Sequence, residues 1–362
     1  MDEWDWTTPD KVTPQKGRGA ASNPDNRFAD RSISTFHDGW DSQDDQPNKL
    51  KTEVLKETSR TIISTNNSPD IPFRSSINPY KGCEHGCIYC YARPTHAYWD
   101  LSPGLDFETK IIVKENAAAL LKETLSKPGY KVSPIVIGAN TDPYQPLEAT
   151  LKITRSLIEV LSAFNHPFSI ISKSGMMTRD LDLLAPMAEK RLFSAAISVT
   201  TLDNDLKRRL EPRAASGQVR LDTIRTLTDA GIPVSMMVAP VIPSINDNEL
   251  ERILTAGHES GAVSAAYILL RLPLEVSDMF IEWLAVHYPD RADKVMSIVQ
   301  NTRGGQDYQS QFGERMRGSG AFADLLQQRF DVACRRLGFE RGEHTSLDSS
   351  LFKRVNQQLA LF

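Results

Sequence analysis

Three cysteines, Cys83, Cys87 and Cys90, lie in one short stretch that reads Cys-Glu-His-Gly-Cys-Ile-Tyr-Cys. Their spacing places three thiols in a single loop, close enough together to bind one metal centre, whereas the remaining cysteine, Cys334, lies far away in the sequence. A structural zinc site normally closes with four ligands, and an electron-transfer iron–sulfur cluster takes four cysteines. Three thiolates on a four-iron cluster would leave one iron open to a substrate or cofactor, and an open iron indicates catalysis.

The cysteine spacing resembles the Cys-x3-Cys-x-aromatic-Cys signature of the radical S-adenosylmethionine (SAM) superfamily. This resemblance implies a 4Fe-4S cluster held by Cys83, Cys87 and Cys90, with the amino and carboxylate groups of S-adenosyl-L-methionine bound to the free iron. It also implies a reaction, in which the reduced cluster passes an electron to the sulfonium and a 5'-deoxyadenosyl radical abstracts a hydrogen atom. A low-potential electron donor of the flavodoxin or ferredoxin type is then the expected partner.

Zinc is the alternative for the same residues. A paired Cys-x-x-Cys is also a zinc spacing, and His85 or His96 would supply the fourth ligand. The protein would then be a zinc-stabilised binding module without catalysis.

The composition fits a soluble protein, and 362 residues are enough for one large α/β domain with appendages or for two ordinary domains. No apolar run approaches the roughly 20 residues that span a bilayer, and the amino terminus lacks a secretory pattern, so we expect a cytoplasmic protein with no membrane contact. The net charge is −4, from 42 basic and 46 acidic residues. That balance gives no support to DNA as a partner, because duplex binders usually carry a basic surface.

Strand and helix patterns alternate through the middle of the chain. Expected strands lie at residues 111–114, 134–138, 168–173, 193–200, 233–239 and 263–270, with helices at 117–125, 147–161, 181–190, 221–230 and 249–258. Alternation of this kind predicts a parallel sheet with helices outside it. Periodicity does not distinguish an open sheet from a barrel, but the radical SAM resemblance implies a partial (β/α)6 barrel with the cluster at the carboxyl ends of the strands.

Three regions are expected along the chain. Residues 1–70 are polar and without a sustained period, which predicts an extended or disordered amino-terminal arm. Residues 71–275 form the radical SAM core. Residues 276–362 form a carboxyl-terminal helical appendage, with helices at 280–286, 292–299 and 322–337, and the helical spacing around Cys334 points that thiol toward a core.

A polar stretch follows the apolar strand at residues 134–138 and contains Thr141 and Asp142. In radical SAM proteins the segment at this place binds the methionyl amine of SAM, so the resemblance makes both residues candidates for that contact. A capped turn before a helix is the structural alternative.

A further resemblance, to the spore photoproduct lyase-like group, covers about residues 75–275. It rests on Glu211-Pro, an arginine nine residues later, an Ala-Gly pair and a Val-Ala-Pro triplet, all in matching order and spacing. The resemblance assigns Ser198 to the SAM ribose, and Lys173 and Arg220 to the SAM carboxylate. Ordinary salt bridges are the alternative for the two cations.

Tyr89 and Tyr91 flank the third cysteine of the loop. Similarity to the lyase places Tyr89 beside the adenine and makes Tyr91 a radical relay, while simple packing of the loop is the alternative for both. The sequence departs from the lyase at Ala139, where that enzyme has a hydrogen-donating cysteine. The substrate is therefore unknown, and a DNA lesion lyase using a tyrosine or an external thiol as hydrogen donor is the alternative.

Overall fold

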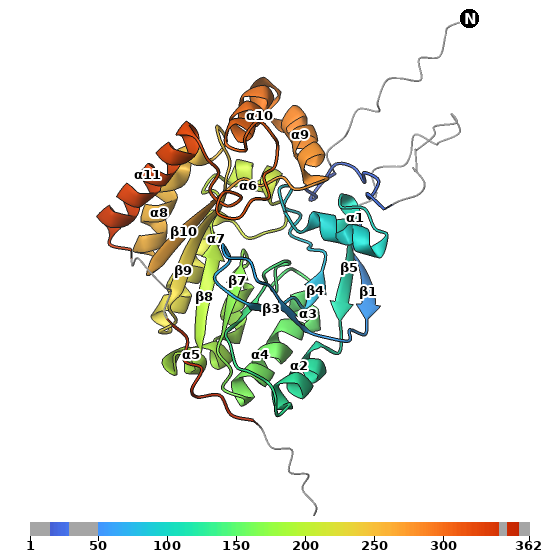
Figure 1. Ribbon diagram of the computed structural model, residues 1–362, viewed down its shortest axis with the longest axis vertical. Coiled ribbons are helices and arrows are strands. Elements are labelled where there is room, and N and C mark those ends of the chain that lie inside the picture. The colour runs from blue at the N-terminus through green and yellow to red at the C-terminus, as the bar shows by residue number, and fades with distance from the viewer. Residues whose placement is uncertain (1–14, 29–49, 340–345, 355–362) are drawn as a thin grey trace, which may run out of the picture.

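A parallel sheet forms the centre of the molecule (Figure 1). The computed structural model describes residues 15–28, 50–339 and 346–354. Strands in the sheet follow the order β10-β9-β8-β7-β6-β3-β2, and all neighbours are parallel except β2. Their bounds are β2 (Ile63–Thr65), β3 (Ser75–Ile77), β6 (Ile135–Ile137), β7 (Phe168–Ser172), β8 (Phe193–Ser198), β9 (Val234–Val241) and β10 (Ser264–Leu269). Six successive parallel strands confirm the expected partial (β/α)6 barrel.

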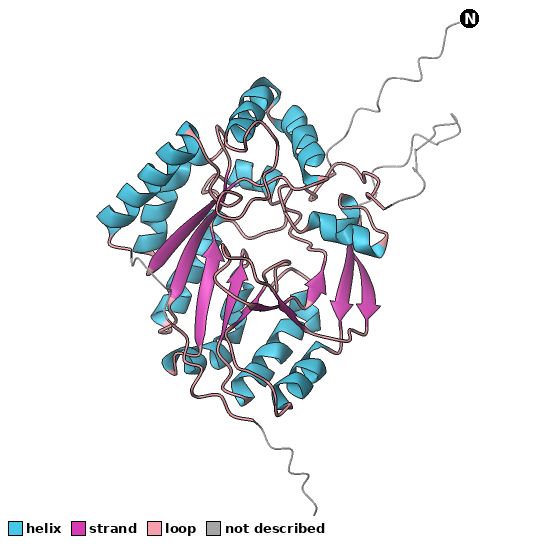
Figure 2. Cartoon of the chain, viewed as in Figure 1, coloured by secondary structure: helices cyan, strands magenta, loops and turns pink. Residues whose placement is uncertain are grey.

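Helices connect these strands and cover the outside of the sheet (Figure 2). The apolar core lies between the sheet and these helices. The connecting helices are α2 (Ala117–Ser126), α3 (Glu148–Leu151), α4 (Ile153–Ala163), α5 (Leu181–Glu189), α6 (Asn204–Leu210), α7 (Gly217–Asp229) and α8 (Leu250–Glu259), with 3-10 turns η2 (Gly175–Asp180) and η3 (Asp247–Glu249).

The single helix expected at residues 147–161 is divided into α3 and α4. Lys152 adopts a left-handed conformation between them, with φ of 53°. The Glu148 carboxylate accepts from the backbone N–H of Thr154 at 3.0 Å and of Arg155 at 3.3 Å. Glu148 therefore caps the first turn of α4 and stabilises the break.

A second, three-stranded sheet has the order β1-β5-β4, with β1 (Glu53–Glu57), β4 (Tyr80–Lys81) and β5 (Lys110–Lys114). The expected strand at 111–114 is present as β5, but it pairs with β1 and β4 and does not join the parallel sheet. An apolar run predicts a buried strand and does not say which sheet receives it.

The expected amino-terminal arm contains ordered structure. β1 and β2 both lie before residue 71, and residues 15–28 pack against the cysteine loop. Residues 1–14 and 29–49 of that arm lie outside the described residues. The strands were missed because they are short and only partly buried.

The carboxyl-terminal region is helical, as predicted. Its helices are α9 (Val276–His287), α10 (Ala292–Asn301) and α11 (Ala321–Leu337), with η4 (Pro289–Arg291) between the first two. Helix α11 packs beside α8, and Cys334 is buried in the main core. Helices α9 and α10 lie at the end of the sheet toward which its parallel strands run (Figure 1). No helix in the described part of the chain is long and apolar enough to cross a membrane.

Candidate active site at the cysteine loop

The cysteine loop follows β4 and leads into η1 (Arg93–Trp99) and α1 (Leu105–Thr109). Cys83 and Cys87 are buried and Cys90 is partly buried. Burial raises the pKa of all three thiols, that of Cys87 to about 12. Repulsion from the Cys90 thiolate contributes to the raised pKa of Cys83 and of Cys87. Because cysteine binds metals as the thiolate, this loop requires a positive centre among its sulfurs to hold them ionised.

Cys83, Cys87 and Cys90 are the three sulfur donors of this loop. No group of three or more His, Cys, Asp or Glu side chains, within the residues that the structure describes, is spaced to hold a single metal ion. Thiolates on a polynuclear cluster each bind a different iron and need not converge. Three thiols within one loop are the ligand chemistry that an iron–sulfur cluster takes.

A buried ion pair between Arg93 and Glu108 contacts the backbone of the cysteine loop. Arg93 donates from Nε to the Cys87 carbonyl at 2.9 Å and from Nη1 to the carbonyls of Pro103 and Gly104 at 3.0 Å. Its Nη2 pairs with Glu108, and both side chains are fully buried. The guanidinium thus fixes the backbone of the second cysteine.

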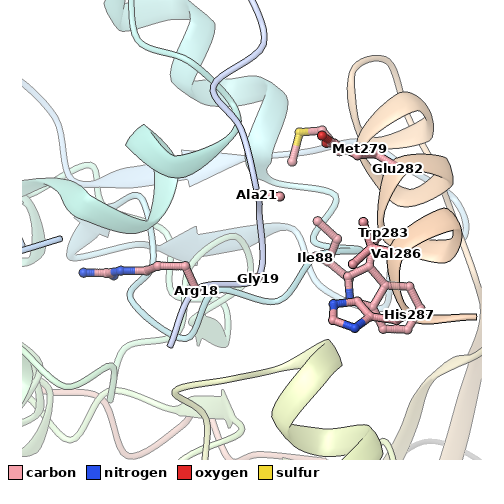
Figure 3. A pocket seen from close by; sticks show the side chains of 9 residues that line it. All are labelled: Arg18, Gly19, Ala21, Ile88, Met279, Glu282, Trp283, Val286 and His287. Atoms are coloured by element: carbon pink, nitrogen blue, oxygen red, sulfur yellow. The ribbon is translucent and has the colours of Figure 1, made fainter. Parts of the chain in front are cut away.

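The segment at residues 15–28 closes the outer side of the loop. The N–H groups of Gly19 and Ala20 donate to the Glu108 carboxylate at 3.0 and 2.9 Å. A Cβ on Gly19 would lie 1.8 Å from the Gly86 carbonyl oxygen, so only glycine permits this approach. A cavity of about 20 Å³ lies between this segment, Ile88 of the loop and α9. In Figure 3, Ile88 lies between Gly19 and Ala21 on one side and Trp283 and Val286 of α9 on the other.

Asp142 and His85 form a second contact beneath the loop. His85 Nδ1 lies 3.3 Å from Asp142 Oδ2, and the same carboxylate accepts from the Ser172 hydroxyl and from the N–H groups of Lys173 and Tyr144 at 2.7 to 2.9 Å. Burial alone would raise the pKa of Asp142, but His85 and these donors hold it at about 2. Asp142 is therefore an ionised carboxylate that joins the cysteine loop to the end of β7.

Thr141 is buried, and its hydroxyl donates to the Tyr80 carbonyl at 2.8 Å. His96 is also buried, with Nε2 3.0 Å from the Lys110 carbonyl, and burial lowers its pKa to about 4. The Thr141 hydroxyl and His96 Nε2 thus have backbone partners, whereas the buried Nδ1 of His96 has no hydrogen-bond partner among the described residues.

Glu211 is the centre of a third buried network. It accepts from Tyr89, from Thr200 and from Arg220, and Lys173 Nζ lies 4.0 Å away. Burial alone would raise the pKa of Glu211, but Arg220 and Lys173 hold it at about 2. The network connects the loop residue between the second and third cysteines to β8 and α7.

Arg220 uses all three guanidinium nitrogens within this network. Nε donates to the Ala215 carbonyl and Nη1 to the Ser198 carbonyl, each at 3.0 Å, and Nη2 pairs with Glu211. Ser198 itself donates to the Ala239 carbonyl at 3.2 Å. Lys173 is partly exposed and has no shorter carboxylate contact among the described residues than that 4.0 Å.

Tyr91 projects from the other side of the loop and is 46% exposed. Its hydroxyl donates to the Ala139 carbonyl just after β6, and the guanidinium carbon of Arg271 lies 5.4 Å from its ring centre. Burial of the hydroxyl raises its pKa to about 12.

The structure therefore brings most of the predicted site residues to one end of the barrel. Tyr89, Lys173 and Arg220 share the Glu211 network, and Asp142 contacts the loop through His85. Sequence reasoning missed Arg93 and Glu108, because nothing in the pattern marks a buried ion pair. The Glu211-Pro pair was noticed, but its central position depends on tertiary contacts.

Comparison with known proteins agrees with this geometry. Residues 77–256 match the radical SAM superfamily. A protein of Mycobacterium tuberculosis is 37% identical over 234 residues, which cover 64% of this chain and 69% of that protein. A protein of Methanocaldococcus jannaschii is 27% identical over 240 residues, which cover 66% of this chain and 85% of that protein.

The fold is also similar to that of spore photoproduct lyase. Its complex with a dinucleoside spore photoproduct aligns with a TM-score of 0.57 at 15% identity, over 80% of this chain and 81% of the lyase. A complex that also holds AdoMet aligns with a TM-score of 0.55 over the same shares, again at 15% identity. The chain belongs to the radical SAM superfamily. It is an enzyme of that class. The alternative interpretation, a zinc-stabilised module without catalysis, is therefore wrong.

Proposed function

We propose that this chain binds one 4Fe-4S cluster through Cys83, Cys87 and Cys90 and reductively cleaves S-adenosyl-L-methionine. When bound, the cluster and SAM would supply a 5'-deoxyadenosyl radical that abstracts a hydrogen atom from a substrate. The observation that supports this proposal is a loop of three closely spaced thiols, two of them buried and one partly buried, in a chain that matches the radical SAM superfamily.

The side chains around the loop have distinct parts in this proposal. Lys173 is the cation available for the SAM carboxylate, because it is partly exposed and only loosely paired. Direct contact of Arg220 with that carboxylate stays a prediction, and its three hydrogen bonds make it a positioning residue for Glu211 and Ser198. Thr141 and Asp142 for the methionyl amine, Ser198 for the ribose and Tyr89 for the adenine also stay predictions.

The electron must come from outside the chain. A flavodoxin- or ferredoxin-type donor remains the proposed partner, since the cluster must be reduced at low potential before SAM is cleaved. Radical relay by Tyr91 is proposed on the basis of its position next to Cys90 and its exposed ring.

Anaerobic reconstitution tests the proposal. Wild-type protein should bind about four irons per chain and convert SAM to 5'-deoxyadenosine in the presence of dithionite, measured by liquid chromatography and mass spectrometry. Alanine at any of the three loop cysteines should abolish both. Cys334→Ala is the matched control, because it removes a buried thiol from the far core. Stoichiometric zinc, or iron without SAM cleavage in wild type, would contradict the proposal.

A DNA lesion lyase stays a prediction. Ala139 lies at the place where the lyase resemblance puts a hydrogen-donating cysteine, so another donor would be needed. Binding to lesion-containing duplex should weaken steeply with salt if phosphates are contacted, and absence of binding would remove this alternative.

A further inference from the structure

Two arginines lie close together beyond the end of the parallel sheet. Arg271 follows β10 by two residues, and Arg303 follows α10 by two residues. Repulsion from Arg271 adds to burial in lowering the pKa of Arg303 to about 10. Nη1 of Arg303 donates to the Glu314 carbonyl at 2.9 Å and Nη2 donates to the Leu270 carbonyl at 2.8 Å, so Arg303 holds the backbone at this end of the barrel.

Arg271 lies beside the cysteine loop. Its guanidinium carbon is 5.4 Å from the ring centre of Tyr91, which directly follows Cys90, and 5.9 Å from that of Tyr308. Tyr91 in turn reaches the Ala139 carbonyl after β6. Arg271 therefore faces the same space as the exposed tyrosine of the loop.

The partners of Arg271 are weak acceptors. Nη1 lies 3.3 Å from the Met316 sulfur and Nη2 3.3 Å from the Tyr308 hydroxyl, while the buried Nε has no hydrogen-bond partner. In the described ranges, no carboxylate oxygen lies within 4.0 Å of this guanidinium, although the two fully buried arginines beside the loop each have one. Its side-chain acceptors, a thioether and a phenol, are therefore both neutral, and the side chain is only partly buried.

A partly buried guanidinium that no described carboxylate neutralises, lying beside a second arginine, favours the binding of an anion. A guanidinium presents Nε and Nη in a planar fork that matches the two oxygens of a carboxylate or phosphate. We propose that Arg271 binds an oxyanion of the substrate at the barrel mouth, next to Tyr91. This inference rests on the proposed function, because a substrate must lie within reach of the radical.

Equilibrium binding of two small probes tests the site and distinguishes its two chemistries. Inorganic phosphate and acetate are titrated separately into reconstituted protein at low ionic strength, with isothermal titration calorimetry as the readout. Wild type should bind one equivalent of at least one probe. Preference for phosphate or for acetate identifies which oxyanion the substrate carries. Arg271→Gln should weaken binding at least tenfold, and Arg271→Lys should weaken it less, because lysine keeps the charge without the fork.

Arg225→Gln is the matched control, since it removes one exposed arginine from α7 on the outer surface with the same change of charge. Equal binding by wild type and Arg271→Gln, or no binding of either probe by wild type, would overturn the inference. Phenylglyoxal labelling of the unaltered protein gives a second measurement that does not depend on variant folding. The bound probe should protect Arg271 and leave Arg225 reactive, and absence of protection would overturn the inference.

The SAM-cleavage assay on the same wild-type preparation separates the two proposals. Cleavage without binding of either probe would overturn the oxyanion site alone. Probe binding that depends on Arg271 in protein that never cleaves SAM would contradict the proposed function and support the site.

Discussion

Arginines on the two sides of the cysteine loop differ in their partners. Beneath the loop, Arg93 and Arg220 each pair with a buried glutamate and donate to backbone carbonyls. At the open side, the acceptors of Arg271 within the described part of the chain are a sulfur and a phenol. Buried pairs of the first kind fix the position of a loop, while a cation of the second kind is available to a ligand.

The paired arginines should therefore contribute mainly to stability, and Arg271 mainly to ligand binding. Removing one partner of a buried pair leaves an uncompensated charge and costs about 3 to 5 kcal/mol. Among the residues that the structure describes, Arg271 has no carboxylate partner, so its replacement should change binding much more than stability. Four predictions test this contrast.

The largest effect is expected from Glu211→Ala. It would leave Arg220 buried and charged without its carboxylate, and should lower the free energy of unfolding by about 3 to 5 kcal/mol. Urea denaturation of the cluster-free protein measures this change. Asp205→Ala, which breaks an exposed pair with Arg208, is the control and should leave the midpoint nearly unchanged. Equal effects of the two variants would contradict the contrast.

The ion pair between Glu211 and Arg220 should also make the free energy of unfolding depend on pH. The folded pKa of Glu211 is about 2, below its usual 4.5, so the ionised carboxylate stabilises the fold. That stabilisation is fully present above about pH 4.5 and is lost as the pH falls toward 2. The difference in unfolding free energy between wild type and Glu211→Gln should shrink by on the order of 3 kcal/mol over this range. A difference independent of pH would show that the carboxylate charge is not the cause.

A smaller effect is expected from Gly19→Ala. The added Cβ would meet the Gly86 carbonyl at 1.8 Å and displace the segment that donates to Glu108. Overpacking of this kind costs about 1 to 3 kcal/mol, and the segment should become more sensitive to limited proteolysis. Gly129→Ala, where a Cβ has no neighbour within 4 Å, is the control. Unchanged proteolysis of Gly19→Ala would mean that the segment does not depend on this contact.

The smallest effect on stability is expected from Arg271→Gln. No described carboxylate loses a partner in this variant, so the free energy of unfolding should change by less than about 1 kcal/mol. Urea denaturation beside Arg93→Gln, which leaves Glu108 buried without its cation, gives the direct comparison. A loss for Arg271→Gln as large as that for Arg93→Gln would show that Arg271 is a structural residue.

Much of the fold could be predicted from the sequence, because apolar runs and their periods report burial directly. The strand expected at 168–173 is β7 at Phe168–Ser172, and the helix expected at 322–337 is α11 at Ala321–Leu337. Periods do not report which strands pair, so β5 was placed in the wrong sheet. The periods also do not predict the break between α3 and α4 at Lys152. That break depends on the Glu148 side chain, which caps the first turn of α4.

The candidate site was predicted in part for a similar reason. Three closely spaced cysteines are visible in the sequence, and most of the residues inferred from family resemblance lie near their loop. Glu108 could not be found, since its partners are Arg93 and the distant backbone of Gly19 and Ala20. The sequence also does not show that Arg271 lacks a carboxylate partner among the described residues, because that depends on which side chains the fold brings near it.

The central claim is that three loop thiolates hold a cluster with one iron open to SAM. Electron paramagnetic resonance of the dithionite-reduced wild-type protein, recorded before and after addition of SAM, tests this most directly. We expect a reduced-cluster signal that depends on Cys83, Cys87 and Cys90 and changes when SAM binds. A reduced-cluster signal that SAM leaves unaltered, in protein with its full iron content, would contradict the account.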